Sequence, residues 1–319
     1  MGRRVLTTLL AVAVSALLLW WLLSDAVIDA LVGGLSRASA ANLLVAFALV
    51  PVIQGFRAWR FALLASGRMS THATTMFAIS ARLVLLNLIL PFKLGELGFP
   101  VMMKRAFGTG YTRSTGILLL ARLMDLGGVG AILLLSAAWL LDPSAAGWSR
   151  TALTAAGIGA LLLPLVVLDA LLPLRRLARR TPRLLPLFDQ LTSAITMVRP
   201  LPQRLAAWAL TLATWLCHTL VAFLAATALS DRIGPVVAAL AGAASNLAFA
   251  VPVPSIAGLG PPQAAWAAVM NAAGISWEIS VATALLCHGV LTVGVVLLGA
   301  ASLLGRGRRP ALSRHLAEP

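Results

Sequence analysis

Residues 90–98 read LPFKLGELG, and this stretch places a lysine and a glutamate three residues apart inside an otherwise apolar part of the chain. Pro91 ends the helix that approaches it, and Gly95 allows a close approach of backbones or an unusual backbone angle. Irregular backbone is tolerated at membrane depth only when protein or a wet cavity surrounds it. The stretch therefore predicts the tip of a hairpin held inside a membrane protein.

The composition of the 319-residue chain is that of an integral membrane protein, because 60% of its residues are hydrophobic and a soluble domain could not bury so many. A bilayer-spanning helix needs about 20 mostly apolar residues. The first apolar run is too long for the core of a typical signal peptide and is interpreted as a span. Six full spans are predicted, near residues 5–23, 41–66, 115–140, 151–172, 203–229 and 279–304.

The net charge of +15 is distributed unevenly between the loops. With the N-terminus inside, most of the 25 Lys and Arg residues fall on the inner side, including Arg57, Arg60 and the loop 175–183. The outer loops carry acids such as Asp25 and Asp29. This pattern predicts cytoplasmic N- and C-termini in an inner (plasma) membrane of the bacterial type. Because the positive charge follows the topology, no nucleic-acid partner is expected.

Two stretches, 75–107 and 235–273, each contain two apolar pieces that are too short to span. Pieces of roughly 13 to 16 residues cover about 20–24 Å, less than a hydrocarbon core of about 30 Å. We expect re-entrant helical hairpins, the first entering from the inner side and the second from the outer side. The halves 5–140 and 151–304 then form an inverted repeat, which is typical of transporters although similar halves also occur in scaffolds.

The predicted fold class is an all-α polytopic membrane protein with six full transmembrane helices and two re-entrant hairpins, all within a single domain 1–319. Segment 183–199 alternates apolar and polar residues at helical spacing, which indicates an amphipathic helix on the inner surface or a plain linker. The basic tail 305–319 is expected to be disordered.

Charged residues at the first hairpin tip point to an anion site. The second half of the hairpin is expected to begin near Leu94, with the positive end of its dipole deep in the protein, where it attracts an anion. Lys93 adds a cation, and Glu96 can hold free amide groups or pair with an arginine.

The following span adds a second pair of charges, Arg122 and Asp125, which are i, i+3 neighbours on one helix face. Arg82 is expected to face the same cavity. Each charge costs about 2.5–3.5 kcal/mol within a membrane, so pairing or a polar cavity is required. A purely structural ion network is the alternative interpretation.

The second hairpin tip, VPVPSIAGLGPPQ (251–263), is uncharged, and its amide groups could hold a headgroup or each other. Pro261 and Pro262 suit the first turn of the helix that follows. The candidate substrate-binding residues of both tips and the adjoining spans are Arg82, Asn87, Pro91, Lys93, Gly95, Glu96, Arg122, Asp125, Pro254, Ser255, Gly258, Gly260 and Gln263.

Other kinds of chemistry find little support. The tripeptide LCH occurs at 216–218 and 286–288, but adjacent helix residues point about 100° apart and rarely reach one metal ion. We therefore interpret these residues as satisfied core residues and expect no metal and no cofactor. The two cysteines indicate no disulfide framework. Without a nucleophilic triad, a phosphate loop or a paired-carboxylate pocket, the chain is not expected to be an enzyme.

The first hairpin and the span after it resemble the lysylphosphatidylglycerol synthase transmembrane family, a flippase-like module found alone or fused to a synthase domain. The resembling residues are Asn87, Pro91, Lys93, Gly95, Glu96, Arg105, Arg122 and Asp125, and VPSIAGLG (253–260) is similar to a later Pro- and Gly-rich segment. The resemblance implies hairpins that line a central cavity and a lipid substrate: an anionic phospholipid, a glycolipid or an isoprenoid-linked lipid.

Two positions depart from the family pattern. Phe99, followed by Pro100, stands where the family often has a basic residue, and Gln263 stands near the place of an acid. A cycle that depends on an acid in the second tip is therefore disfavoured. No synthase domain follows, so aminoacyl transfer is not expected in this chain.

These observations predict a lipid flippase or lipid transporter that binds an anionic headgroup between two hairpin tips. The alternatives are a non-transporting membrane scaffold for an envelope-lipid biosynthetic enzyme and a transporter of small solutes. A homo-oligomer and a partner enzyme of envelope biosynthesis are left open, as are the lipid, the direction and the energy source.

Overall fold

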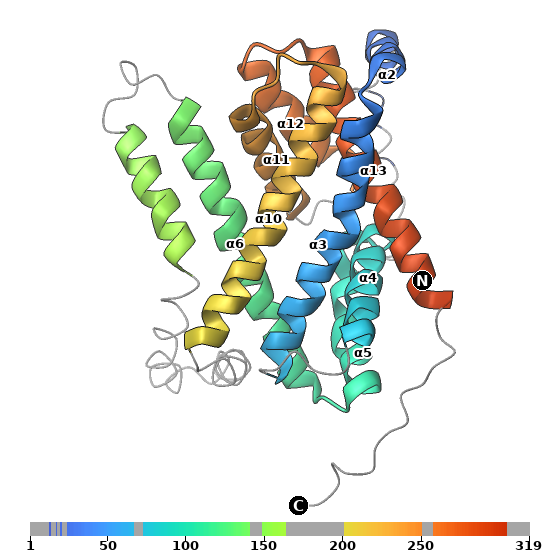
Figure 1. The fold of residues 1–319 in the computed structure, drawn as a ribbon, viewed down its shortest axis with the longest axis vertical. Helices are drawn as coiled ribbons and strands as arrows, with labels where there is room; N and C mark the ends of the chain where they lie inside the picture. Colours follow the sequence, from blue (N-terminus) through green and yellow to red (C-terminus); the bar gives the residue numbers. More distant parts are fainter. Residues whose placement is uncertain are drawn as a thin grey trace, which may run out of the picture.

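The computed structural model describes residues 24–66, 73–140, 149–163, 201–250 and 258–304, together with Ala13, Leu17 and Trp20. All regular elements within these residues are helices (Figure 1). In chain order they are α2 (Asp25–Arg37), α3 (Ala40–Ser66), α4 (Ala73–Ile89), the 3₁₀ helix η1 (Pro91–Leu97), α5 (Gly98–Phe107), α6 (Tyr111–Leu140), an apolar helix at Ser149–Leu163, α10 (Leu201–Leu229), α11 (Pro235–Ala250), α12 (Pro261–Ala272) and α13 (Trp277–Leu304).

Among the described helices, four are long and apolar enough to cross a bilayer, namely α3, α6, α10 and α13. With 26 to 30 residues each, they reach about 39–45 Å and exceed a hydrocarbon core of about 30 Å. They confirm four of the predicted spans, and the chain is an all-helical polytopic membrane protein.

Other predicted segments are described in part or not at all. The predicted span 151–172 is described as far as Leu163, as a helix. Apart from the three isolated positions, the predicted span 5–23 lies outside the described residues, as do segment 183–199 and the tail 305–319.

Two pairs of shorter helices lie at opposite ends of the molecule, α4 with α5 at the lower end of the view and α11 with α12 at the upper end (Figure 1). Their bounds agree with the stretches 75–107 and 235–273. The longest of these helices has 17 residues and is about 26 Å long, less than a hydrocarbon core. The short helix pairs are therefore present where the sequence predicts them.

The tip of the first pair differs from the prediction that its second helix begins near Leu94. Residues Pro91–Leu97 form η1, and α5 begins at Gly98. Lys93 has φ +55°, which lies in the left-handed region and interrupts the dihedral angles of an α-helix. The α-helix can therefore resume only after this residue.

Helix α2 corrects the prediction of a loop around Asp25 and Asp29. Ser24 caps the helix by accepting a hydrogen bond from the Val27 amide, and Asp25 in the first turn favours the positive end of the helix dipole. Val27 is fully buried and packs with Val281 of α13 and with α12. The segment is thus a packed part of the fold.

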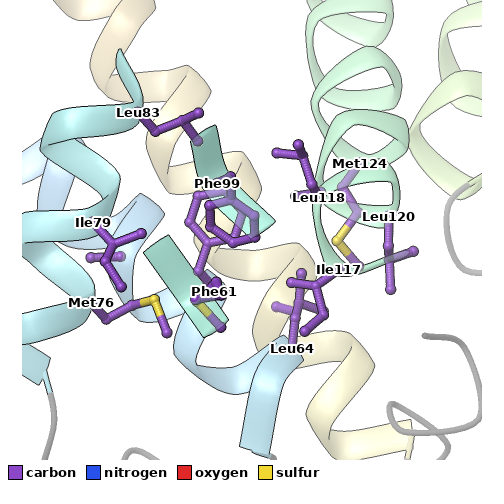
Figure 2. Close-up of a cluster of buried hydrophobic side chains, with 14 of the residues drawn as sticks. Phe61, Leu64, Met76, Ile79, Leu83, Phe99, Ile117, Leu118, Leu120 and Met124 are labelled. Carbon is purple, nitrogen blue, oxygen red and sulfur yellow. The ribbon is translucent and has the colours of Figure 1, made fainter. Parts of the chain in front are cut away.

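Buried apolar side chains form two main clusters, one around each short helix pair. The first joins α4 and α5 to α3 and α6, and its Phe61 and Phe99 rings lie 4.7 Å apart. Figure 2 shows Phe99 between the side chains of α4 and those of α6. The second cluster joins α11 and α12 to α10 and α13, around Trp266 and Met270. Helices α3 and α10 pack extensively on each other and contribute to both clusters.

Helix α13 approaches α3 closely at Gly294, where a Cβ atom would lie 2.7 Å from Val50 Cγ1. We expect Gly294→Ala to destabilise the protein by about 1–3 kcal/mol, because the branched valine cannot move aside freely. Gly289→Ala is the control, since no atom lies within 4 Å of its Cβ position. It should be neutral or stabilising, because alanine favours the helix. Thermal unfolding in detergent compares the two variants, and equal melting temperatures would contradict this packing.

Candidate functional site

A cavity of about 490 Å³ lies where the two apolar clusters meet. Phe61 and Leu83 of the first cluster and Ile53 and Trp266 of the second all line it. A volume of this size suits a small molecule or a lipid headgroup. Of the described residues that line the cavity, six carry charged side chains: Arg57, Arg60, Lys93, Glu96, Arg122 and Asp125.

Asp125 of α6 is the acceptor at the centre of an ion network. Arg60 of α3 donates to it twice, from Nη1 to Oδ1 at 2.7 Å and from Nη2 to Oδ2 at 3.1 Å. Trp215 Nε1 donates to Oδ1 at 3.3 Å, and Arg122 Nη1 donates to Oδ2 at 3.2 Å. Arg60 Nη1 also donates to Thr211 Oγ1. One buried network therefore joins α3, α6 and α10.

Arg122 connects this network to the tip of the first short helix pair, because its Nε lies 2.8 Å from Glu96 Oε1 of η1. The sequence predicted an arginine partner for Glu96 and a shared face for Arg122 and Asp125. The side chains of Arg122 and Glu96 are 36% and 26% exposed, against 1% for Arg60 and 10% for Asp125. The ion pair of Arg122 with Glu96 is thus partly exposed, whereas the ion pair of Arg60 with Asp125 between α3 and α6 is buried.

Arg57 of α3 bonds to a histidine of α10, with Nη2 2.9 Å from His218 Nε2. A guanidinium group can only donate, so the imidazole accepts at Nε2 and carries its proton on Nδ1. This Nδ1 is buried and has no hydrogen-bond partner among the described residues. An imidazole that accepts at one nitrogen carries no charge, so this contact does not neutralise Arg57.

Lys93 brings the two short helix pairs into contact, because its Nζ lies 4.9 Å from the centroid of the Phe249 ring on α11. The left-handed conformation of this lysine costs of order 1–3 kcal/mol and persists only where the surroundings enforce it. Such strain clusters at ligand sites, which marks the tip as a candidate functional element.

Gly95 lets η1 press against α4, since a Cβ atom here would lie 2.5 Å from the backbone nitrogen of Asn87 and the carbonyl carbon of Leu86. Asn87 lines the cavity, and its Oδ1 is buried without a hydrogen-bond partner in the described part of the chain. Pro91 stands at the first position of η1. A buried acceptor of this kind calls for a donor from a ligand or water.

The described part of the second tip, residues 258–263, has two glycines with positive φ and a side-chain cap. Gly258 has φ +69° and Gly260 has φ +110°, both in the region that favours glycine. Gln263 is buried, and its Oε1 accepts a hydrogen bond from the Gly260 amide at 2.7 Å. It therefore caps α12, and Pro261 and Pro262 occupy the first turn as predicted.

Three arginines lie elsewhere than the sequence predicted. Arg57 and Arg60, counted as inner-side charges, line the cavity. Arg82 was expected in the cavity but is not among its lining residues; its guanidinium donates to Ser302 Oγ at 3.3 Å and to the Ser302 carbonyl. The candidates Pro254 and Ser255 lie outside the described residues.

A local signal could have found the two missed arginines. Gln54, Arg57 and Arg60 recur at every third position inside an apolar run, which places them along one face of a helix. All three line the cavity, and Gln54 Oε1 accepts a hydrogen bond from Ser80 Oγ of α4.

Both cysteines of the LCH tripeptides are core residues as interpreted, because Cys287 is a buried member of the second apolar cluster and Cys217 packs against it. The histidines differ from that interpretation, since His218 and His288 line the cavity, as Cys287 also does. Both cysteines are free thiols. Within the described ranges, no group of three or more His, Cys, Asp or Glu side chains is arranged to hold a metal ion.

Removing the central acceptor tests the ion network. We expect Asp125→Ala to destabilise the protein by roughly 3–5 kcal/mol, because Arg60 would remain buried without its counter-charge. The double variant Arg60→Leu with Asp125→Leu should recover part of this loss, because it removes both charges. Asp29→Ala, at an exposed acid of α2, should unfold as wild type does. Melting temperatures in detergent measure these effects, and strictly additive losses would count against the pair.

Comparison with protein families gives a match over nearly the whole chain. A family model described as the lysylphosphatidylglycerol synthase TM region matches residues 8–299, a range that includes both short helix pairs and every residue lining the cavity. No curated protein and no solved structure matches the chain.

Proposed function

The chain belongs to the lysylphosphatidylglycerol synthase transmembrane family, and we propose that it moves lipids across the membrane as a flippase or lipid transporter. One observation carries the proposal: a cationic cavity lies where two short helix pairs from opposite ends of the molecule meet. A headgroup is the charged part of a lipid, and a cavity of this volume can surround it. The name of the family refers to a phospholipid product, which agrees with a lipid substrate.

The proposed topology has six full spans and two re-entrant hairpins, with halves 5–140 and 151–304 related as an inverted repeat. Its support is the placement of the short helix pairs at opposite ends (Figure 1). The equivalent helices α3 and α10 pack along each other, as equivalent elements beside a pseudo-two-fold axis do. The N- and C-termini are placed on the cytoplasmic side.

Lipid chains stay in the bilayer in this proposal, so the cavity opens sideways between helices. Leu126 of α6 supports a lateral opening, because it lines the cavity and is 55% exposed. The headgroup binds Arg122, whose pairing with Glu96 is accessible from the cavity. Charge-assisted hydrogen bonds from an arginine to a phosphate are short and strong, which makes this residue the first contact for an anionic headgroup.

Single-cysteine labelling tests the topology, in a background where Cys217 and Cys287 are replaced by alanine. Lys104→Cys at the end of α5 should react only from the cytoplasmic side, and Asn271→Cys in α12 only from the outside. Both positions are exposed. Labelling of intact cells with a membrane-impermeant maleimide separates the sides, and reaction of both cysteines from one side would refute the inverted arrangement.

Lipid movement by the reconstituted protein tests the function itself. Wild type should move a fluorescent anionic lipid between leaflets, as followed with a membrane-impermeant quencher. We expect Arg122→Gln to slow this movement by roughly ten- to a hundredfold, the value of one or two charge-assisted hydrogen bonds. Glu96→Gln, which removes the competing carboxylate charge, should also change the rate.

Arg113→Gln provides the matched control, because Arg113 is exposed, donates to the Ala65 carbonyl at the end of α3 and is not among the described residues that line the cavity. It should move lipid at the wild-type rate. Folded wild-type protein that moves no lipid would defeat the proposal and favour a membrane scaffold. Equal rates for wild type, Arg122→Gln and Glu96→Gln would show that the site is wrong.

A further inference from the structure

The charges that line the cavity do not balance. Among the described residues that line it, four side chains are basic and two are acidic, so two positive charges are in excess. The connecting segments 67–72 and 251–257, which adjoin the short helix pairs in sequence, contain no Asp or Glu. An uncompensated charge at membrane depth is costly, so the surplus points to a negatively charged ligand.

The contacts show which two cations form the surplus. Arg60 and Arg122 share the two carboxylates of the cavity, Asp125 and Glu96. Arg57 instead contacts the imidazole of His218, and Lys93 contacts the ring of Phe249. Neither Arg57 nor Lys93 has a carboxylate within 4 Å among the described residues.

Both partners of the surplus cations are uncharged. An aromatic face attracts an ammonium group but leaves its charge in place, and a neutral imidazole only accepts a hydrogen bond. These contacts hold the cations in position without neutralising them. A ligand with negative charge can therefore pair with Arg57 and Lys93 without displacing a carboxylate from either of them.

The backbone at Lys93 strengthens this reading. The residue has φ +55°, a conformation that asparagine and aspartate adopt several times more readily than other non-glycine residues. Asparagine would adopt this conformation at lower cost than lysine. The positive charge of Lys93 is what asparagine would not supply at this position. The conformation directs that charge to the contact between the two short helix pairs.

We propose that the headgroup carries two negative charges on phosphate, as a phosphate monoester or a diphosphate does, and that Arg57 and Lys93 bind it. This inference rests on the proposed function. Arg57 supplies a planar guanidinium with several donors, and Lys93 supplies a compact point charge. A phosphodiester headgroup with one charge leaves one of the two cations uncompensated. Inorganic phosphate and diphosphate share the same chemistry, so a lipid and a free anion must be told apart.

The test is native mass spectrometry of the full chain with equal amounts of phosphatidic acid and phosphatidylglycerol that carry identical acyl chains. At mildly alkaline pH the monoester carries two charges and the diester one. We expect wild type to retain phosphatidic acid over phosphatidylglycerol by roughly tenfold, the effect of one additional charge-assisted contact. Equal retention of the two lipids would overturn the inference.

Charge-removing variants locate the effect. Lys93→Asn keeps a residue that tolerates the left-handed conformation, so it should fold, and its preference for phosphatidic acid should fall towards one. Arg57→Gln retains an amide donor beside His218 and should lose the preference in the same way. Lys104→Asn is the control, because Lys104 is exposed on α5, stacks on Tyr111 and lies outside the cavity lining. An unchanged preference in both cavity variants would reject these residues as the site.

Inorganic phosphate and diphosphate, added to the wild-type complex, separate the two sources of the anion. Retention of phosphatidic acid in their presence supports a lipid ligand, and its displacement supports a site that recognises the free dianion as well. A preference for neither lipid, with lipid still bound and moved, defeats this inference alone. Absence of any retained lipid and of lipid movement defeats the proposed function together with it.

Discussion

The ion pair between Arg60 and Asp125 is the interaction on which the arrangement of the long helices depends. It joins α3 to α6 in a region where Arg60 is 1% exposed. Removing two charges from water is expensive, and the attraction between them compensates only when the remaining donors and acceptors are also satisfied. Asp125 meets this requirement by accepting from Arg60, Arg122 and Trp215. Because a buried pair is weak evidence for stability, its value here lies in what it positions: Asp125 holds Arg122 towards the cavity.

Each short helix pair consists of two helices that are too short to span a bilayer, but the charged side chains that the described residues of the two pairs bring to the cavity come from the tip of the first pair. The first tip supplies Lys93 and Glu96, and its irregular η1 backbone keeps both at the cavity. The second tip is uncharged, and its Gln263 is occupied by capping α12. Helix α11 contributes the Phe249 ring that meets Lys93. The proposed inverted repeat is therefore symmetrical in its helices and asymmetrical in its charge.

Local patterns predicted the features that depend on neighbouring residues. Pro and Gly positions gave the bounds of both short helix pairs, and the spacing of Arg122 and Asp125 gave their shared face. Features that depend on how a helix is rotated were missed. Arg82 points to α13, and charge counting placed Arg57 and Arg60 at the membrane surface because it cannot tell an arginine at a helix end from one facing a cavity. The left-handed Lys93 was also missed, because lysine gives no sequence signal for this conformation.

The exposures of the two ion pairs determine which part of the molecule can move in the proposed cycle. Glu96 and Arg122 are partly exposed, and a pair of that kind contributes about 0–1 kcal/mol. Breaking a buried pair such as Arg60 with Asp125 costs about 3–5 kcal/mol. An incoming phosphate can therefore replace Glu96 on Arg122, while Asp125 keeps both of its arginines. Among the described side chains, Glu96 forms the ion pair between η1 and α6, so its release in the proposed cycle would free η1 and leave α3, α6 and α10 in place. In this proposal, headgroup binding loosens the first short helix pair and not the long helices.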